Sequence, residues 1–430
     1  MTGSSRPYAV LLGPHPVHFD HATRLDVGVV LLDTVENLAA ETGRYAGRAD
    51  HVLATDYTDA ERVAQLIQVL CGGLDVRGVL ALTENGLLPA ARMNAILGAK
   101  DNPVDVVERV MDKRLMRAWL SGDQAFTLPA RVVESARSLQ EFAREFGTPV
   151  VVKPSDGAGS AGVRVLRDMA EVAAWTPSRN GATLLAEQYV HGTEYSVEAF
   201  SVDGQHLIAA VTEKVLARCA GENGLVEVGH NLPARLARDT DTALRAFVRD
   251  FLDRLGLREG LSHTEVILSP QGPVIVETHT RNGGDHIADL VLLSTGLDLR
   301  DLALRSRCGL LHGAPASPEP TGGAAIRYFT PAPGVVEEIG GLDAARYLPG
   351  VVDLDVGVGI GERVRPLRSS FDRVGYVIAV GADTDQAEQR CLAAVDTVTI
   401  RTRDGDTAVP GAARDASGAS PAEVATASPS

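Results

Sequence analysis

The sequence predicts a multidomain fold of the α/β and α+β classes that begins with a doubly wound parallel sheet. The chain has 430 residues, which is enough for about two to four domains. In its first part, short apolar segments alternate with amphipathic ones, and this alternation is typical of a parallel sheet flanked by helices. Further along, strands of alternating polarity appear, which indicates antiparallel pairs. A small α+β subdomain is expected near the C-terminus.

The N-terminal α/β domain is predicted to cover residues 1–103. A helix is expected at 58–70, because its apolar residues recur on one side. The histidine-rich segment His15–His21 follows the first strand, and its prolines predict a loop there. Substrate contact or a plain solvated loop is favoured over a zinc site. The other expected elements are strands at 8–13, 25–32 and 78–82 and a helix at 87–97.

The central domain is predicted to span residues 104–312. It is expected to open with a single helix at 105–120 that carries Asp112 and Lys113. Strands of alternating polarity, 195–201 among them, are expected to have one covered face. The other expected elements are strands at 131–133, 150–153, 163–166, 184–187, 207–212, 262–268 and 273–278 and helices at 139–146 and 240–255.

The rest of the chain is predicted to form a linker, a subdomain and a tail. Residues 313–322 are rich in Pro, Gly, Ala and Ser and are interpreted as the linker. A small unit with glycine-punctuated strands is expected at 323–405. Residues 406–430 contain too few apolar side chains to fold, so they are predicted to be disordered.

Composition narrows the range of functions and compartments. The formal net charge is −15 and the isoelectric point is about 5.2, which disfavours binding to nucleic acid or to anionic membranes. The four cysteines lie far apart, without metal-ligand or disulfide spacing, so a reducing cytoplasm fits best. The polar start of the chain indicates no signal peptide. No apolar run approaches the roughly 18 residues that span a membrane. We therefore expect a cytoplasmic protein.

A glycine-rich loop between two apolar strands is the most informative local feature. The first strand ends at Lys153, and the loop contains Gly157, Gly159, Ser160 and Gly162. Small residues let backbone N–H groups turn toward an anion, and a lysine adds a charge that can reach phosphate. The strand-to-helix geometry of a Walker loop is absent. The alternative is an ordinary glycine-rich hairpin turn.

Two carboxylates, Glu265 and Glu277, are expected on neighbouring strands of a tight hairpin whose turn is at 269–272. Each has apolar neighbours on both sides, so both side chains are expected on one shared face. Two carboxylates at one site repel each other unless a cation lies between them, and hard oxygen ligands suit Mg²⁺. The alternative is that each glutamate caps a strand or pairs with an arginine.

A third segment joins a buried strand to a turn. It is a possible hinge near 187–190 whose backbone reads an adenine edge, followed by Glu194, which could hold ribose hydroxyls. An ordinary strand-to-turn segment is the favoured interpretation of these residues alone. The hinge residues are Glu187, Gln188, Tyr189 and Val190.

In combination, these segments resemble the ATP-grasp superfamily, whose elements appear here in the expected order over residues 100–310. The chain looks most similar to its L-amino-acid ligase branch, which are carboxylate–amine ligases. Three features carry this narrower resemblance: the segment Val226–Ala234, the triplet His263-Thr264-Glu265, and the unit from Gly323 with its segment Arg373–Ile378. The resemblance implies a central ATP-grasp fold and a C-terminal closing subdomain.

The resemblance also implies a role for each site residue. Lys113 and Lys153 would neutralise the phosphates of ATP, and the glycine loop would cover them. The hinge residues would line the adenine pocket, and Glu194 would bind ribose. Glu265 and Glu277 would hold Mg²⁺, with Mn²⁺ as an alternative.

The candidate catalytic residues are Arg281, His230 and His279. Arg281 would face the transferred phosphate or the substrate carboxylate. Many members have asparagine where this chain has His279, and imidazole is a poorer Mg²⁺ ligand, so a bond to phosphate or substrate is its alternative role. Deprotonation of the amine is assigned to His230, His279 or Glu222, with His230 ranked first.

The implied activity is ATP-dependent ligation of a carboxylate to an amine through an acyl phosphate, with release of ADP and phosphate. The expected partners are small carboxylate and amine substrates, amino acids above all, and a second copy of the chain in a homodimer. One alternative is an ATP-grasp enzyme with another acceptor, of the carboxylase or purine-pathway type. Another is a noncatalytic ATP-binding regulatory protein.

Two further interpretations concern residues near these segments. Asp285 is expected to be a helix N-cap rather than a substrate contact. Glu213 and Lys214 are expected to form an ion pair at the surface, although they lie close to the segment assigned to the amine.

Overall fold

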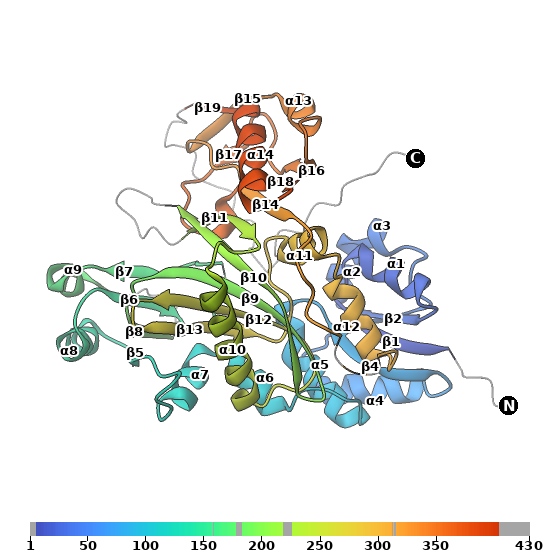
Figure 1. Cartoon of the computed structure of the whole chain (residues 1–430). Helices are drawn as coiled ribbons and strands as arrows, with labels where there is room; N and C mark the ends of the chain where they lie inside the picture. The colour runs from blue at the N-terminus through green and yellow to red at the C-terminus, as the bar shows by residue number, and fades with distance from the viewer. Residues whose placement is uncertain are drawn as a thin grey trace. The chain divides into compact units, whose positions relative to one another are not determined.

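The computed structural model describes residues 6–157, 159–177, 183–217, 226–311, 313 and 315–403 (Figure 1). The chain divides into two compact units, and each draws on three stretches of sequence. Unit 1 comprises Met1–Leu128, Val190–Val211 and Leu236–Glu319, and unit 2 comprises Pro129–Tyr189, Thr212–Arg235 and Pro320–Ser430. The predicted domain boundaries follow the sequence linearly, whereas these units interleave, so the boundaries stay a prediction.

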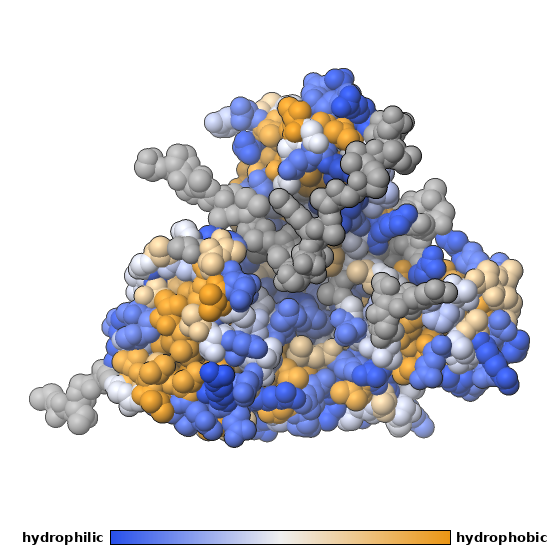
Figure 2. Space-filling view, turned by 180° about the vertical axis from the view of Figure 1, so that it is seen from behind, coloured by the Kyte–Doolittle hydropathy of each residue, from blue (hydrophilic) through white to orange (hydrophobic). Residues whose placement is uncertain are grey.

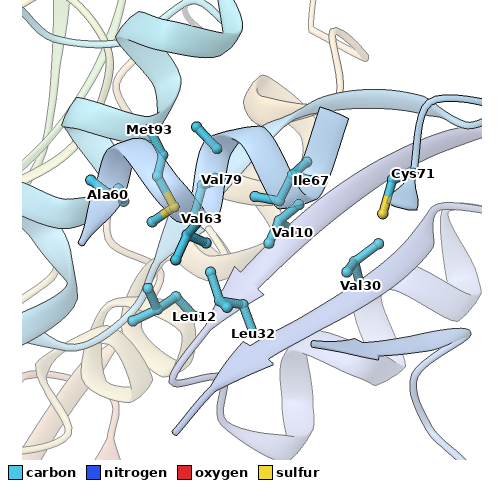
Figure 3. Packing of buried hydrophobic residues seen from close by; sticks show 12 residues of the cluster. Val10, Leu12, Val30, Leu32, Ala60, Val63, Ile67, Cys71, Val79 and Met93 are labelled. Atoms are coloured by element: carbon cyan, nitrogen blue, oxygen red, sulfur yellow. The ribbon is translucent and has the colours of Figure 1, made fainter. Parts of the chain in front are cut away.

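Unit 1 begins with a parallel four-stranded sheet in the order β3-β2-β1-β4. Its apolar strands are covered on both faces. Val63, Ile67 and Met93 pack on one face against Val10 of the sheet (Figure 3), and α1 and α12 cover the other. The predicted doubly wound sheet is therefore confirmed. Its elements are β1 (Pro7–Leu12), α1 (Pro16–Arg24), β2 (Gly28–Asp33), α2 (Val35–Ala40), α3 (Thr42–Tyr45), β3 (His51–Ala54), α4 (Ala60–Leu70), β4 (Asp75–Ala81), α5 (Glu84–Leu97) and α12 (Leu299–Arg307).

Two local predictions in unit 1 are wrong. A helix, α1, replaces the expected loop after the first strand, because Pro16 suits a first helical position and His15 forms a capping box with His18. The single helix expected at 105–120 is two helices, α6 (Val104–Met111) and α7 (Lys113–Leu120). Asp112 has an extended backbone between them, and its carboxylate caps α7 by accepting from the Arg114 N–H.

The remainder of unit 1 is an antiparallel sheet in the order β13-β12-β9-β10, to which β10 contributes its residues up to Val211. Strand β9 is buried along nearly its whole length, so the prediction of one covered face is wrong for this strand. Helices supply the second cover: α12 packs against β9 and β12, and Arg245 of α10 donates to the Ile208 carbonyl. The elements are β9 (Thr193–Val202), β10 (Gln205–Ala217), α10 (Arg238–Leu255), β12 (Gly260–Ser269), β13 (Gly272–His279) and α11 (Ile287–Thr295).

Unit 2 contains a four-stranded antiparallel sheet in the order β5-β8-β6-β7. Val150 pairs with Leu166 and Val152 with Arg164, so the predicted strand–loop–strand hairpin is present. Phe142 of α8 and Val172 of α9 belong to its core. The elements are β5 (Ala130–Val133), α8 (Ala136–Phe146), β6 (Val150–Pro154), β7 (Arg164–Leu166), α9 (Met169–Ala174) and β8 (Leu184–Gln188).

The C-terminal part of unit 2 is a small α+β unit, as expected. In its larger sheet the second part of β10 is followed by β11, β14, β18 and β16, and a second sheet has the order β17-β15-β19. Helix α14 packs on β14 and β18 through Ala387 and Cys391. The elements are β11 (Val226–Leu232), β14 (Gly323–Tyr328), β15 (Gly334–Gly340), α13 (Leu342–Arg346), β16 (Val351–Val356), β17 (Arg363–Val364), the 3₁₀ helix η1 (Ser370–Asp372), β18 (Gly375–Gly381), α14 (Thr384–Thr397) and β19 (Thr399–Arg403).

Hydrophilic side chains cover most of the face shown in Figure 2, and apolar side chains gather over the N-terminal part of the chain. Val35, Val52, Val69 and Leu70 are among the exposed apolar residues of that part. Within the described ranges, no helix has the length and apolar content needed to cross a membrane. The predicted tail at 406–430 lies outside the described residues.

Candidate active site

Glu265 and Glu277 lie directly opposite each other on β12 and β13. Opposed residues of an antiparallel pair project from the same face of the sheet, so the pairing predicted for the two carboxylates is present. Their side chains are 16% and 18% exposed, which leaves both partly open to solvent. The tight hairpin creates this register, because Ser269 and Gly272 close its turn.

A lysine and a histidine side chain contact Glu277. Lys113 Nζ lies 2.9 Å from Glu277 Oε2, and His279 Nε2 lies 3.1 Å from Oε1. Burial alone would lower the pKa of Lys113, but the charge of Glu277 and its hydrogen bond raise it overall. Arg117, one helical turn after Lys113, donates to the carbonyls of Ile275 and Val276. That buried arginine, which the sequence did not indicate, fixes α7 to the strand that carries Glu277.

Glu265 has a different set of neighbours. His263 Nε2 lies 3.4 Å from Glu265 Oε1, and a carboxylate oxygen of Glu194 lies within 4.8 Å of one from Glu265. Three strands, β9, β12 and β13, thus bring Glu194, Glu265 and Glu277 into one region of unit 1 (Figure 1). Facing carboxylates repel each other, and hard oxygen donors are the ligands that Mg²⁺ prefers. Carboxylate oxygens are therefore the right kind of ligand for a divalent cation in this region.

Arg281 follows β13 and contacts a glutamate that sequence reasoning missed. Arg281 Nη2 lies 2.6 Å from Glu84 Oε2, and His279 Nδ1 lies 3.8 Å from Glu84 Oε1. Burial would raise the pKa of Glu84, but the His279 and Arg281 charges outweigh it and lower the pKa. Glu84 opens α5 at the carboxyl end of β4, which is where parallel sheets bind ligands. Arg281 and Asn282 also line a cavity of about 80 Å³ within unit 1.

In unit 2, two predicted site residues contact each other. Lys153 Nζ lies 2.7 Å from Glu187 Oε2, and the two side chains are 7% and 5% exposed. The sequence assigned Lys153 to phosphate and Glu187 to adenine, and the antiparallel pairing of β6 with β8 brings them together. A buried charge needs such compensation. The buried pair thus keeps each charge matched by the other.

The predicted hinge coincides with a crossing of the chain between units, since unit 2 gives way to unit 1 between Tyr189 and Val190. Backbone N–H groups of Gln188 and Tyr189 donate to the carbonyls of Pro129 and Pro149. These bonds hold the end of β8 against its own unit. The adenine role of the segment remains a prediction.

The glycine loop adopts backbone conformations that favour glycine. Gly159, Ser160 and Gly162 have φ angles of +61°, +59° and +76°. The Ser370 N–H of η1 donates to the Gly159 carbonyl at 3.0 Å. A Cβ atom at Gly159 would lie 3.1 Å from the ring of Phe371. The C-terminal part of unit 2 therefore supports the loop, a contact that no local sequence signal indicated.

His230 lies in a buried cluster on β10 and β11. Its Nε2 is 3.6 Å from Glu227 Oε2, and Lys214 Nζ is 2.7 Å from Glu227 Oε1. The surface pair expected between Glu213 and Lys214 is wrong, because consecutive strand residues point to opposite faces. Glu213 bonds Arg235 instead, and Lys214 is buried.

Two further candidate residues are Glu222 and Asp285. Glu222 is outside the described residues. Asp285 does not cap α11 as expected, since the N-cap is His286, whose φ is +60°. His286 bonds Asp289 at 3.0 Å. In the described parts of the chain, the groups of side chains that could hold a metal ion do not include His15, His18 or His21.

Comparisons with known proteins match two parts of this chain. A model of the ATP-grasp domain matches residues 146–289, and a model of the L-amino acid ligase C-terminal domain 2 matches residues 327–403. Both matches fall on segments that the resemblance had singled out. Together they support the C-terminal subdomain as well as the central domain.

Curated relatives and a solved structure give the same picture. The uncharacterized protein y4rH of Sinorhizobium fredii is 26% identical over 91% of this chain and 78% of its own length. The alanine–anticapsin ligase of Bacillus amyloliquefaciens is 24% identical over 61% of this chain, which spans 60% of that relative. The crystal structure of an L-amino acid ligase from Bacillus licheniformis aligns with a TM-score of 0.77 at 21% identity, over 94% of this chain and all of the other. That likeness confirms the expected fold.

Proposed function

We propose that this chain, which matches the ATP-grasp domain and the L-amino acid ligase C-terminal domain 2, is an ATP-dependent carboxylate–amine ligase. The observation that carries this proposal is the opposed pair Glu265 and Glu277 with Lys113 against it. The match of residues 327–403 to the L-amino acid ligase C-terminal domain favours this class over ligases with other acceptors.

The reaction would proceed in two steps. A substrate carboxylate oxygen attacks the γ-phosphorus of ATP, so that an acyl phosphate forms and ADP leaves. The lone pair of an amine then attacks the acyl carbon, phosphate leaves with the electrons of the C–O bond, and the nitrogen loses a proton. Positioning and charge neutralisation account for catalysis of both steps, because no covalent bond to the protein is needed.

In unit 1, Glu194, Glu265 and Glu277 supply carboxylates from three adjacent strands. Glu265 and Glu277 would hold Mg²⁺, or Mn²⁺ in its place, and Glu194 would bind ribose. A bound divalent cation would neutralise charge on the phosphate oxygens. Lys113, now bonded to Glu277, would add a second positive charge. Arg281 would stabilise charge on the transferred phosphate or hold the substrate carboxylate.

In unit 2, Lys153 would contact phosphate, and the loop from Gly157 to Gly162 would cover it and exclude water from the acyl phosphate. The segment 187–190 would hold adenine. His230 would accept the proton of the amine, because Glu227 lies beside its Nε2 and Lys214 holds Glu227 in place. His279 contacts Glu277 and Glu84, so it would act on phosphate or substrate rather than on the amine proton.

The substrates would be two amino acids, or an amino acid and a related small acid. We place the protein in the cytoplasm, where its free cysteines Cys71, Cys308 and Cys391 would stay reduced. A homodimer is the proposed assembly. Gel filtration with light scattering would test that assembly directly.

A matrix of amino-acid pairs incubated with MgATP would test the function. The expected result is a product with the mass of the condensed pair, equal amounts of ADP and phosphate, and no phosphate without both substrates. Added hydroxylamine should trap the acyl phosphate as a hydroxamate. Release of AMP and pyrophosphate would contradict the mechanism. Tight ATP binding without turnover on any pair would favour a regulatory protein.

A further inference from the structure

Glu198, on strand β9, is a fully buried carboxylate that the proposed mechanism does not use. A carboxylate removed from water requires hydrogen-bond or charge partners. Glu198 has one for each oxygen, His263 on β12 and Gly283 in the loop after β13, and all three residues belong to unit 1.

The first partner connects Glu198 to the proposed metal ligand. His263 lies directly opposite Glu198 in the β9–β12 pair. Its Nδ1 is 2.5 Å from Glu198 Oε1, and its Nε2 is 3.4 Å from Glu265 Oε1. The imidazole is therefore held at both nitrogens by carboxylates. Rotation of the ring would break both contacts, so Glu198 sets the orientation of the group beside Glu265.

The second partner connects Glu198 to the segment of Arg281. The Gly283 N–H donates to Glu198 Oε2 at 3.0 Å. A Cβ atom at Gly283 would lie 2.7 Å from His263 Nδ1 and 3.0 Å from Glu198 Oε1. Only glycine fits there without displacing the pair. Because Gly283 lies two residues after Arg281, this bond fixes the loop that carries Arg281.

We propose that Glu198 is a positioning residue that holds Glu265, through His263, and the Arg281 loop, through Gly283, in the geometry that metal and phosphate require. The inference rests on the proposed function, since it assumes that Glu265 is a metal ligand. Its physical basis is general: partners behind a ligand orient it, and their loss weakens metal affinity by about 10–100-fold.

The test measures metal binding apart from turnover. Mn²⁺ is titrated into the full chain with a non-hydrolysable ATP analogue, and free Mn²⁺ is followed by electron paramagnetic resonance. Glu198→Gln keeps the shape of the side chain but removes its charge, so we expect a dissociation constant about 10–100-fold higher. His263→Gln and Gly283→Ala should weaken Mn²⁺ in the same direction. If one of these three variants fails to fold, the Mn²⁺ affinity of the other two still tests the proposal.

A matched control comes from the same unit. Asp298 also bonds a histidine, with its Oδ2 3.0 Å from His21 Nε2, and it caps α12. Asp298→Asn should lower the melting temperature yet bind Mn²⁺ as the parent does. A purely structural role for Glu198 predicts instead that Mn²⁺ affinity follows melting temperature in both variants.

The inference would be overturned if Glu198→Gln bound Mn²⁺ as tightly as the parent does. It would also be overturned if Asp298→Asn weakened Mn²⁺ binding as much as Glu198→Gln does. Glu265→Gln separates this failure from that of the proposed function. If Glu265→Gln binds Mn²⁺ like the parent, the metal assignment itself is wrong. If Glu265→Gln weakens Mn²⁺ while Glu198→Gln does not, only the role of Glu198 falls.

Discussion

The two units hold their charged candidate residues in different ways. In unit 1, Glu194, Glu265 and Glu277 project from adjacent strands, and Lys113 stands at the start of a helix anchored by Arg117. In unit 2, Lys153 lies on β6, and the glycine loop that follows this strand is supported by Ser370, far along the chain. Ligands on strands are fixed by the sheet itself, whereas a loop is fixed only by the contacts it makes. The proposed metal ligands therefore lie on rigid elements, as the precise geometry of a metal site requires, whereas the proposed cover of the phosphates is a loop.

The largest effect should come from the carboxylates of unit 1. The double variant Glu265→Gln/Glu277→Gln removes the anionic ligands while keeping their shape, so turnover should fall by about 1,000-fold or more, which corresponds to several kcal/mol. ADP release in a coupled assay measures this. Thermal melting checks that the variant folds. Turnover within tenfold of the parent would show that unit 1 does not hold the metal.

The two lysines should differ in their effect on stability. Lys153→Met removes the cation that is paired with the buried carboxylate of Glu187, which costs about 3–5 kcal/mol. The Lys113→Met variant should cost less, because the side chain of Glu277 remains partly exposed and keeps His279. Urea titration measures both, and both should lower kcat/KM for ATP by roughly 100-fold, the loss of a charge-assisted contact.

A second variant separates the two roles of Lys153. In Lys153→Met/Glu187→Leu, both charges are gone, so most of the lost stability should return while ATP use stays impaired. If ATP use also recovers, Lys153 is structural and the phosphate role is wrong.

A smaller effect is expected from the glycine loop. Gly159→Ala must hold a φ of +61°, which costs about 1–2 kcal/mol, and its Cβ would crowd Phe371. We expect about tenfold lower kcat. Phe371→Ala in the same chain should recover part of it. Gly122→Ala, where a Cβ meets open space, is the control. An unchanged kcat for Gly159→Ala would mean that the loop has no covering role.

The last prediction concerns the stability of unit 1 in acid, which should have the smallest effect at neutral pH. Burial, reinforced by the charge of Arg300, lowers the pKa of His18 to about 3, so the folded chain keeps it neutral. The unfolded chain binds a proton below pH about 6.5. The free energy of unfolding should therefore fall as pH drops from about 6.5 toward 3, by up to about 1.4 kcal/mol per pH unit.

Hydrogen exchange at pH 5 and pH 7 would locate this sensitivity. Protection factors, which are corrected for the pH dependence of intrinsic amide exchange, should fall first in α1 and the parallel sheet at pH 5, and His18→Asn should reduce the pH dependence of the free energy of unfolding. Equal acid sensitivity in parent and variant would assign the effect to other groups.

Local patterns in the sequence predicted much of the fold and part of the site. The hairpin of Glu265 and Glu277 was predictable because both strands and their turn are contiguous. The glycine hairpin was predictable for the same reason. Helix caps were harder to predict. Asp112 separates two helices although the sequence predicts one continuous helix, and His15 caps a helix in a segment whose prolines predict a loop.

The residues that sequence reasoning missed are partners across long separations. Glu84 at the start of α5 meets Arg281 after β13, and Glu198 on β9 meets His263 on β12, only because the fold brings distant segments together. A lone glutamate carries no signal of this in one sequence. Glu227 lies within the segment Val226–Ala234 that carries the resemblance, but its contact with Lys214 depends on strand register. Sequence thus indicated which residues carry charge, and structure showed how each charge is compensated.

The bond between Ser370 and Gly159 has a consequence for protein engineering. Through this bond the C-terminal segment supports the loop near residue 159, although a family model treats residues 327–403 as a separate module. In a chimera that exchanges this segment between related ligases, the residues that contact the loop would no longer match it. Compatible exchanges should be those that transplant residues 157–162 together with Ser370 and Phe371.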